Sequence, residues 1–272
     1  MTFWEGRLMV LGEMRQQKLK EILLREGSVR IADLKERFGV SEETVRRDLK
    51  KLESEGLARR THGGALLAEP VHVVPPAVQR MRQNVEEKAV LADFAATLVT
   101  DGSTVMLDSG TTTLEIARRL ALRSVTVVTN DVVIAAELAN SAHVQLVVLG
   151  GAHQRGTSCV AGPECVEMIG RYHVDVVFLG AGGISTRQGL TTASSAEREV
   201  KRAMMQAGER VYCVADASKF GRAALVSYAR VDEIDAIVTH RAISAEVVAA
   251  LQEQGAELIF AESSGTWEGT KS

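Results

Sequence analysis

The sequence predicts an α/β protein in two parts, a small N-terminal winged helix-turn-helix and a larger α/β domain with a mostly parallel sheet. Short amphipathic helices and a glycine turn occupy the N-terminal part, whereas continuous aliphatic runs alternate with helical patterns in the rest. Residues 1–62 hold 14 Lys and Arg against 11 Asp and Glu, a net charge of +3, and the remaining residues hold 18 against 24. A basic head on an acidic body suits a nucleic-acid-binding domain joined to a domain of another kind.

Composition excludes several classes of protein. With 46% apolar and 25% charged residues over 272 positions, the chain can bury a sizeable core, which excludes long disorder. No apolar run reaches the roughly 18 residues of a membrane helix, and the N-terminus lacks a secretory signal, so we expect a cytoplasmic protein without a membrane partner. Three cysteines without C-x-x-C spacing and six histidines without metal spacing lead us to expect no metal and no cofactor.

The boundary between the two domains is marked by proline. Three of the four prolines are Pro70, Pro75 and Pro76. Proline fixes φ and keeps the preceding residue out of the helical region, so this stretch is expected to run extended. We therefore expect a first domain that ends at residue 65, a linker over 66–84, a second domain over 85–262 and a flexible tail over 263–272.

Hydrophobic periodicity predicts the elements of each domain. In the first, apolar spacing predicts helices from Arg15 to Glu26, from Ile31 to Phe38 and from Ser41, its cap, to Gly56, followed by a strand and a glycine turn. In the second, strands are predicted at 104–107, 125–128, 144–149, 174–179, 211–215, 234–238 and 257–260. Helices are predicted between them at 85–99, 111–121, 131–140, 162–170, 194–207 and 244–254. Such alternation is typical of a parallel sheet covered on both faces.

The second and third predicted helices have the spacing of a helix-turn-helix. With Val45, Leu49 and Leu52 facing inward, a period of about 100° per residue places Arg47 and Lys50 on the opposite side. Such a face suits the major groove of DNA, although a solvated amphipathic helix has the same pattern. The candidate DNA contacts on this helix are Thr44, Arg46, Arg47, Lys50 and Lys51, and those in the following wing-like turn are Arg59, Arg60 and His62.

Small and polar residues follow several predicted strands, at the edge where parallel sheets bind ligands. The segment DSGTTT opens a helix, and its N–H groups and threonine hydroxyls suit an anion such as phosphate, although a plain strand-to-helix turn has the same residues. Asn130 is expected to cap a helix at the same edge, and Lys219 offers a cation beside Asp216. The loop residues that meet a ligand, or only turn the chain, are Asp108, Ser109, Gly110, Thr111, Thr112, Thr113, Gly150, Gly151, Gly180, Gly182 and Gly183.

Residues 40–65, VSEETVRRDLKKLESEGLARRTHGGA, closely resemble the winged-helix signature of the DeoR family. The resemblance continues over roughly residues 14–240 through SGTTT, VVTND, LGG, LGAGG, AEREVKRAMM and DASKFG. It implies a bacterial transcription regulator, usually a repressor, with a sensor domain like ribose-5-phosphate isomerase and a phosphorylated sugar or polyol as effector. The resemblance adds Ser41 to the expected DNA contacts. It also implies that residues 1–13 are an N-terminal extension, because regulators of this family commonly start near the position of Met14. It places phosphate on Ser109 to Thr113 and Lys219, and sugar hydroxyls near Asn130, Gly150, Gly182, Glu197 and Asp216.

The alternative is an isomerase-like enzyme with an accessory nucleic-acid-binding head. An aldose–ketose isomerase needs a base and acids that polarise a carbonyl. The related isomerases carry an acid-rich turn at the loop that resembles residues 179–183, where this chain has no carboxylate, and Glu197 is left as a lone base. We therefore expect sensing without turnover. We also expect a dimer or tetramer on operator DNA, because one short recognition helix contacts few base pairs.

Overall fold

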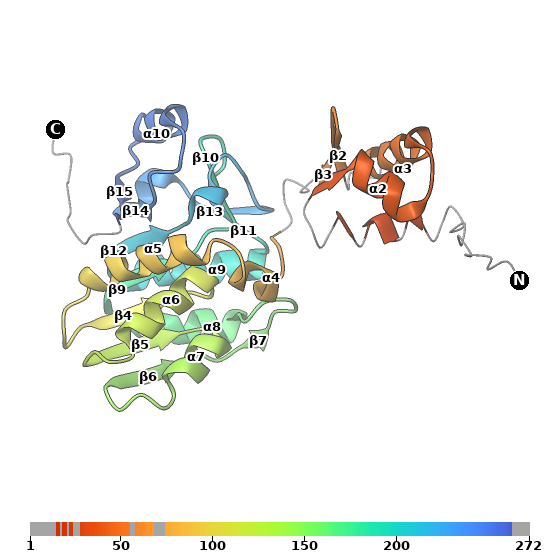
Figure 1. Ribbon diagram of the computed structural model, residues 1–272. Helices are drawn as coiled ribbons and strands as arrows, with labels where there is room; N and C mark the ends of the chain where they lie inside the picture. The colour runs from red at the N-terminus through yellow and green to blue at the C-terminus, as the bar shows by residue number, and fades with distance from the viewer. Residues whose placement is uncertain are drawn as a thin grey trace, which may run out of the picture. The chain divides into compact units, whose positions relative to one another are not determined.

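The computed structural model describes residues 15–16, 18–20, 22–23, 28–54, 58–67 and 74–262 (Figure 1). The chain divides into two compact units between Pro70 and Val71. The expected extension over 1–13, the expected tail over 263–272 and residues 68–73 of the expected linker lie outside the described residues. We call the two parts the N-terminal unit and the larger unit.

The N-terminal unit is a helix-turn-helix followed by a β-hairpin. Its elements are β1 (Ser28–Arg30), α2 (Ile31–Phe38), α3 (Glu42–Ser54), β2 (Ala58–Thr61) and β3 (Gly64–Leu67), and residues 15–16, 18–20 and 22–23 are helical as well. Helix α2 ends at Gly39, whose left-handed φ of 62° favours glycine. Ser41 precedes α3 as predicted, and its Oγ accepts the N–H of Thr44 at 3.2 Å. The three strands pair antiparallel in the order β1-β3-β2, so β1 and β3 are added to the single strand and glycine turn that the sequence predicted.

The larger unit is built on a seven-stranded parallel sheet in the order β15-β14-β12-β9-β4-β5-β6. Its strands are β4 (Thr104–Leu107), β5 (Val125–Thr129), β6 (Val144–Val148), β9 (Val174–Leu179), β12 (Gly208–Val214), β14 (Ala236–Thr239) and β15 (Leu258–Phe260). The helices are α4 (Ala77–Met81), α5 (Val85–Thr97), α6 (Thr111–Leu120), α7 (Val132–Leu138), α8 (Pro163–Ile169), α9 (Ser195–Ala207) and α10 (Ala245–Gln252). The predicted α/β class with a parallel sheet is confirmed.

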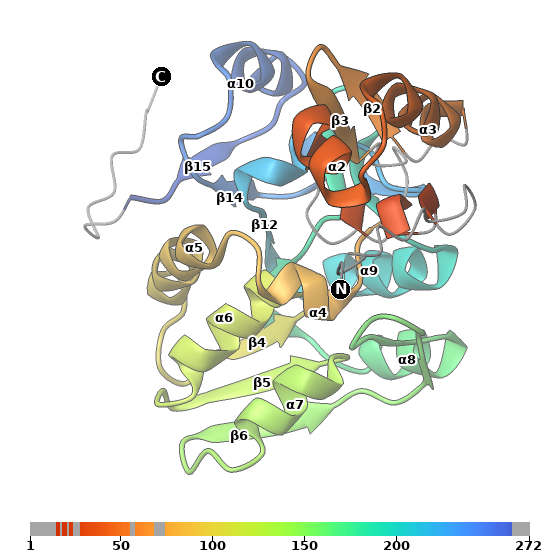
Figure 2. The same cartoon turned by 45° about the vertical axis from the view of Figure 1, so that its right-hand side comes forward.

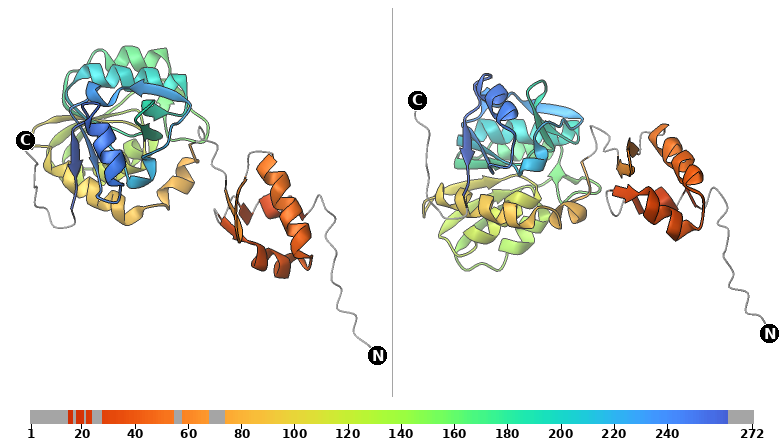
Figure 3. Two further views of the ribbon diagram at one scale, coloured as in Figure 1. Left: turned by 90° about the horizontal axis from the view of Figure 1, so that it is seen from above. Right: turned by 45° about the horizontal axis from the view of Figure 1, so that its top comes forward.

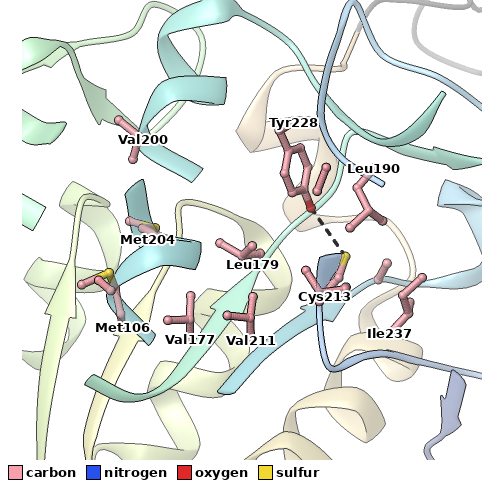
Figure 4. Packing of buried hydrophobic residues seen from close by; sticks show 14 of the residues in the cluster. Met106, Val177, Leu179, Leu190, Val200, Met204, Val211, Cys213, Tyr228 and Ile237 are labelled. Carbon is pink, nitrogen blue, oxygen red and sulfur yellow. Dashed lines mark hydrogen bonds between the residues drawn. The ribbon is translucent and has the colours of Figure 1, made fainter. Parts of the chain in front are cut away.

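Helices cover the sheet on both faces, and the aliphatic strands supply a core to each (Figure 3). Along β9, Val177 and Leu179 pack with residues of α8, α9 and α10, whereas Val176 and Phe178 pack with residues of α5, α6 and α7. Figure 4 shows part of the first cluster, where the Tyr228 hydroxyl donates to the Cys213 sulfur at 3.8 Å. Continuous apolar strands are therefore explained by burial on both faces.

Three features of the larger unit are absent from the sequence prediction. A small antiparallel sheet joins β10 (Gly183–Ser185), β11 (Gly189–Thr192) and β13 (Val226–Ala229). A hairpin joins β7 (Ala152–His153) and β8 (Val160–Ala161). The extended linker expected over 66–84 is wrong for α4, which begins directly after Pro76, because proline restricts the residue before it and is compatible with a helix that starts there.

Candidate functional site

A cavity of about 660 Å³ lies at the carboxyl ends of the central strands of the larger unit. The loops after β4, β5 and β9 line it, together with the turn of the β7–β8 hairpin and the segment that enters α4. Ligands of open parallel sheets bind at this edge, because the loops there are free to diverge while the strands hold them in place. The cavity is therefore the candidate ligand site.

The first turn of α6 faces this cavity. Gly110 is the N-cap residue, and no side chain caps the helix. Thr111 and Thr112 are both 7% exposed, and the Thr113 hydroxyl donates to the Gly110 carbonyl at 2.9 Å. Because the first N–H groups of a helix have no acceptor within it, an uncapped first turn beside a cavity is suited to bind an anion.

The loop that precedes α6 is fixed by Asp131, a residue that the sequence analysis left without a role. Its Oδ1 accepts the N–H groups of Val133 and Ile134, so Asp131 caps α7. Its Oδ2 accepts the hydroxyls of Ser109, at 2.7 Å, and Ser158. The prediction that Asn130 caps this helix is wrong, because α7 begins one residue later than expected. The Ser109 hydroxyl holds the loop in place by donating to Asp131.

Asn130 lies in the cavity wall with its side chain 1% exposed. Its Nδ2 donates to the Val160 carbonyl at 2.9 Å and to the Cys159 sulfur at 3.2 Å. Within the described part of the chain, its Oδ1 has no hydrogen-bond partner. A buried acceptor without a donor is costly, so this atom fits a hydroxyl supplied by a ligand.

A buried ion pair between Lys201 and Asp108 forms the floor of the cavity. The Lys201 ammonium donates to Asp108 and, at 3.0 Å, to the Gly180 carbonyl, and Asp108 accepts the Gly180 N–H at 2.9 Å. The Tyr228 hydroxyl, whose one proton is shared with the Cys213 sulfur, also lies 3.1 Å from the Gly180 carbonyl. Burial raises the pKa of the Asp108 carboxyl, and the Lys201 ammonium opposes that rise. Burial alone lowers the pKa of Lys201, but the Asp108 carboxylate raises it overall, so the lysine stays charged.

Glu197 and Arg80 complete the charged lining. Glu197 accepts the Thr192 hydroxyl at 2.5 Å, and its own N–H donates to the cap residue Ser194 at 3.2 Å. Arg80 lies on α4, and its Nε donates to the Pro75 carbonyl at 2.9 Å. Burial lowers the pKa of the Arg80 guanidinium, and the carboxylates of the cavity, Glu197 and Asp108 first, oppose that shift. A guanidinium remains charged under these conditions.

The structure brings some of the predicted effector residues to the cavity and not others. Those that line it are Asp108, Ser109, Gly110, Thr111, Thr112, Thr113, Asn130, Gly180, Gly182, Glu197 and Lys219. Those that do not are Gly150, Gly151, Gly183 and Asp216.

Packing explains the four that lie elsewhere. A Cβ on Gly151 would lie 2.8 Å from the Ala161 carbonyl oxygen, and one on Gly183 would lie 2.7 Å from that of Arg222, so both glycines permit close backbone contacts. The N–H of Gly150 is directed at the Met168 sulfur, at 3.5 Å. Asp216 caps a short 3-10 turn (Ala217–Lys219) and accepts the side-chain amide of Asn84 at 2.8 Å.

The sequence analysis missed Lys201 and Arg80 as cavity residues. Lys201 lies on the buried face of α9, beside Val200 and one turn before Met204 and Met205. A lysine on an otherwise apolar stripe was the available signal, because a buried charge requires a partner. Arg80 carried no such signal, because it lies in the segment that was expected to be an extended linker.

The exposed face of α3 carries the predicted DNA contacts. Val45, Leu49 and Leu52 are buried, and Arg47 and Lys50 are exposed, as the helical period requires. Five of the other predicted residues have hydrogen-bond partners within the unit. Arg46 pairs with Glu42 at 2.7 Å, and Lys51 donates to Gln16 at 2.7 Å. The Arg60 N–H donates to Glu53 at 3.2 Å, and the hydroxyls of Ser41 and Thr44 share a hydrogen bond of 2.9 Å. His62 is exposed in the turn, and the Arg59 side chain lies outside the described residues.

Asp48 fixes the orientation of α3 within the N-terminal unit. It is 4% exposed and accepts the Arg15 Nε at 2.6 Å and the Gln16 amide at 3.3 Å. The hydrogen bond from Arg15 to this carboxylate raises the pKa of the arginine. The first helical segment is therefore held to the candidate recognition helix by a largely buried ion pair.

Neither a membrane helix nor a metal cluster is found in the described ranges. No helix there is long and apolar enough to span a bilayer. No group of three or more His, Cys, Asp or Glu residues in those ranges is arranged to hold a metal ion.

Comparison with known proteins assigns both units. A family profile described as the DeoR-like helix-turn-helix domain matches residues 15–71, and one described as the DeoR C-terminal sensor domain matches residues 83–241. The chain is 38% identical to the transcriptional repressor AccR of Agrobacterium fabrum, over 83% of this chain and 88% of that protein. It is 34% identical to the transcriptional repressor GlcR of Bacillus subtilis, over 82% and 86%. A solved ribose 5-phosphate isomerase A from Neisseria gonorrhoeae matches 50% of this chain and 53% of its own at 17% identity, with a TM-score of 0.37.

We predict that Lys201→Met lowers the free energy of unfolding by about 3–5 kcal/mol, because it leaves Asp108 buried without its partner. Without the Lys201 charge to oppose burial, the folded-state pKa of Asp108 rises further above the unfolded value, so the folded variant binds more protons relative to its unfolded state than wild type does. The deficit relative to wild type therefore grows as pH rises above the ordinary aspartate pKa of about 3.9. Urea unfolding of the two proteins across this range measures it.

The neighbouring Arg202→Met is the matched control for this prediction. Arg202 forms a partly exposed pair with Glu233 at 2.9 Å, so its loss is expected to cost less than about 1 kcal/mol at every pH. A Lys201→Met deficit that stays constant with pH would contradict the role assigned to the buried pair.

Proposed function

The chain belongs to the DeoR family of transcriptional regulators, and on that premise we propose that it represses a sugar or polyol catabolic operon under the control of a phosphorylated effector. The effector binds in the cavity and sets the affinity for operator DNA. The observation that carries this proposal is the pairing of a helix N-terminus capped only by glycine with a buried acceptor that has no donor among the described residues. The first suits a phosphate and the second suits a sugar hydroxyl.

The phosphate lies against the first turn of α6. An anion there gains from the free N–H groups and from the positive end of the helix dipole. Gly110 leaves room at the cap position, and the hydroxyls of Thr111 and Thr112 lie in the same wall. Lys219 also lines the cavity and adds positive charge.

The sugar hydroxyls lie deeper, near Asn130 and Glu197. The Asn130 Oδ1 accepts one hydroxyl, and Glu197 accepts another because a carboxylate accepts several hydrogen bonds at once. The alternative of an isomerase is disfavoured. The family and the relatives named above are transcription regulators, and the loop at residues 179–183 carries no carboxylate to polarise a carbonyl.

Operator DNA is bound by α3 in the major groove, with the β2–β3 hairpin beside the backbone. Arg47 is exposed on the face of α3 opposite its buried stripe, so it is the residue placed to pair with a base. Arg60 lies in the hairpin and contacts phosphate. The regulator acts as a dimer or tetramer, because twofold pairing doubles the contacts of a short recognition helix.

We predict that Arg47→Ala weakens operator binding by about 1–3 kcal/mol and relaxes the preference for one base pair. Arg60→Ala should weaken binding to all DNA sequences equally. It should also reduce the slope of log affinity against log salt concentration by about 1, as the loss of one phosphate contact does. Fluorescence anisotropy on operator duplexes, at several salt concentrations, separates the two. An Arg47→Ala variant with unchanged affinity would remove this residue from the interface.

We predict that a phosphorylated sugar binds the full chain and that its unphosphorylated parent binds at least about tenfold more weakly, because the α6 donors are left without a charged acceptor. Thr111→Glu should abolish binding by repelling the phosphate, and Thr111→Val, which adds no charge, should retain most of it. Isothermal titration against ribose 5-phosphate, glucose 6-phosphate and the free sugars measures both effects. Equal affinity for phosphorylated and free sugar would contradict the phosphate site.

We predict that the full chain sediments as a dimer or tetramer at micromolar concentration, both alone and on its operator. Association through the larger unit leaves the N-terminal units free to occupy two half-sites. Analytical ultracentrifugation with labelled duplex gives the stoichiometry directly. A monomer that binds the complete operator with full affinity would refute this part of the proposal.

A further inference from the structure

The segment 74–81 belongs to the wall of the cavity. Val74, Pro75, Pro76 and Arg80 all line it. This segment is also the first described part of the larger unit after the boundary between the two units. A ligand in the cavity therefore touches the stretch of chain that leads to the N-terminal unit.

Arg80 has hydrogen-bonding capacity that the described residues do not use. The Nε–H group donates to the Pro75 carbonyl, and this is the only hydrogen bond of the guanidinium within the described part of the chain. The two terminal nitrogens carry four of the five N–H donors of an arginine side chain. They are available to an acceptor in the cavity.

No protein carboxylate in the described residues takes that position. Glu197 and Asp108 are close enough to favour the charged form of Arg80, yet each is hydrogen-bonded elsewhere, to Thr192 and to Lys201. Burial disfavours the charge, as the lowered pKa of Arg80 records. A half-buried guanidinium of this kind is stabilised most by an anion that accepts two of its N–H groups in parallel.

Helix α4 brings this cation to the anion site already described. It packs against α6, as Figure 2 also shows, and both the first turn of α6 and Arg80 line one cavity. A second independent sign of a ligand is the Asn130 Oδ1, which is buried in the same wall and has no hydrogen-bond partner in the part of the chain that the structure describes. Donors thus face the cavity from two elements that are distant in sequence.

Other contacts hold α4 at both ends. The Ala77 N–H at its start donates to the Gly156 carbonyl in the β7–β8 turn, at 3.2 Å. The Lys88 ammonium, only 3% exposed, donates to the carbonyls of Arg80 and Gln83 at 2.5 and 2.6 Å. Arg80 therefore lies on a short helix that is hydrogen-bonded to the β7–β8 turn at its start and to Lys88 at its end.

We propose that Arg80 is the second half of the anion site, so that the phosphate of the effector is clamped between its guanidinium and the first turn of α6. The clamp fixes α4, and the position of α4 sets the conformation of the chain that leads to the DNA-binding unit. The inference rests on the proposed function, since it assumes a phosphorylated effector in this cavity. It names the contact by which that effector controls DNA binding.

The test uses the full chain and three probes: inorganic phosphate, ribose 5-phosphate and glucose 6-phosphate. Isothermal titration gives the affinity of each probe for wild type, Arg80→Ala, Arg80→Lys and the exposed neighbour Arg82→Ala. Anisotropy on a duplex selected by the wild-type protein gives the affinity for DNA with and without each probe. Thermal melting of each variant reports whether it is folded.

We expect Arg80→Ala to bind the phosphorylated probes about 10–100-fold more weakly, as loss of a charge-assisted pair of hydrogen bonds does. Arg80→Lys should recover part of this, because it restores the charge without the planar fork, and Arg82→Ala should behave as wild type. All four proteins should bind DNA without probe. At probe concentrations that saturate Arg80→Ala, that variant should keep its DNA while wild type releases it.

Three results would overturn the inference. Wild-type probe affinity in Arg80→Ala removes Arg80 from the anion site. If Arg80→Ala that is saturated with a phosphorylated probe releases DNA as wild type does, Arg80 does not couple effector binding to DNA binding. If Arg80→Ala does not fold, the Arg80→Lys variant provides the test. Wild-type affinity for the phosphorylated probes together with wild-type release of DNA in Arg80→Lys would exclude a bidentate clamp. If wild type itself binds none of the phosphorylated probes, the proposed function fails as well, and this outcome is distinct from the other three.

Discussion

The buried ion pair between Lys201 and Asp108 holds the ligand-binding edge of the larger unit together. Lys201 comes from α9 and Asp108 from the end of β4, and both are hydrogen-bonded to the backbone of Gly180 at the end of β9. The loops after β4 and β9 and the helix α9 are thereby joined to one another through hydrogen bonds at Gly180. Removing one partner of such a pair leaves a charge in the core, so the arrangement is strongly constrained.

The chemistry of the cavity follows from that constraint. Because Asp108 is fixed, the loop to Gly110 is fixed, and the first turn of α6 faces the cavity with a glycine at its cap position. Asp131 secures the same loop through Ser109. Several carboxylates and hydroxyls near the sheet thus hold the loops, and the groups of the described residues that face the cavity include the N–H groups of α6, Arg80, Lys219, Glu197 and the Asn130 oxygen. That set selects an anionic group joined to hydroxyls.

Much of this could be predicted from the sequence, because period and turn residues report local structure. The helix-turn-helix, the parallel sheet and the strand-end loops follow from apolar spacing and glycine positions. Pairings between distant segments do not. Lys201 meets Asp108 across 93 positions, and no local pattern encodes that contact. Asp131 caps α7 because the helix begins at Val132, one residue later than the sequence pattern predicted. Arg80 was missed because the prolines before it predicted an extended chain where the short helix α4 forms.

A closed thermodynamic cycle measures the proposed coupling between ligand and DNA most directly. The affinity of the tightest-binding sugar phosphate should be determined on the full chain, once free and once saturated with operator duplex. Operator affinity should then be measured with and without that sugar phosphate. We expect DNA to weaken sugar phosphate binding by the same factor by which sugar phosphate weakens DNA binding. Sugar phosphate affinity that is unchanged by saturating operator would show that the cavity does not control DNA binding.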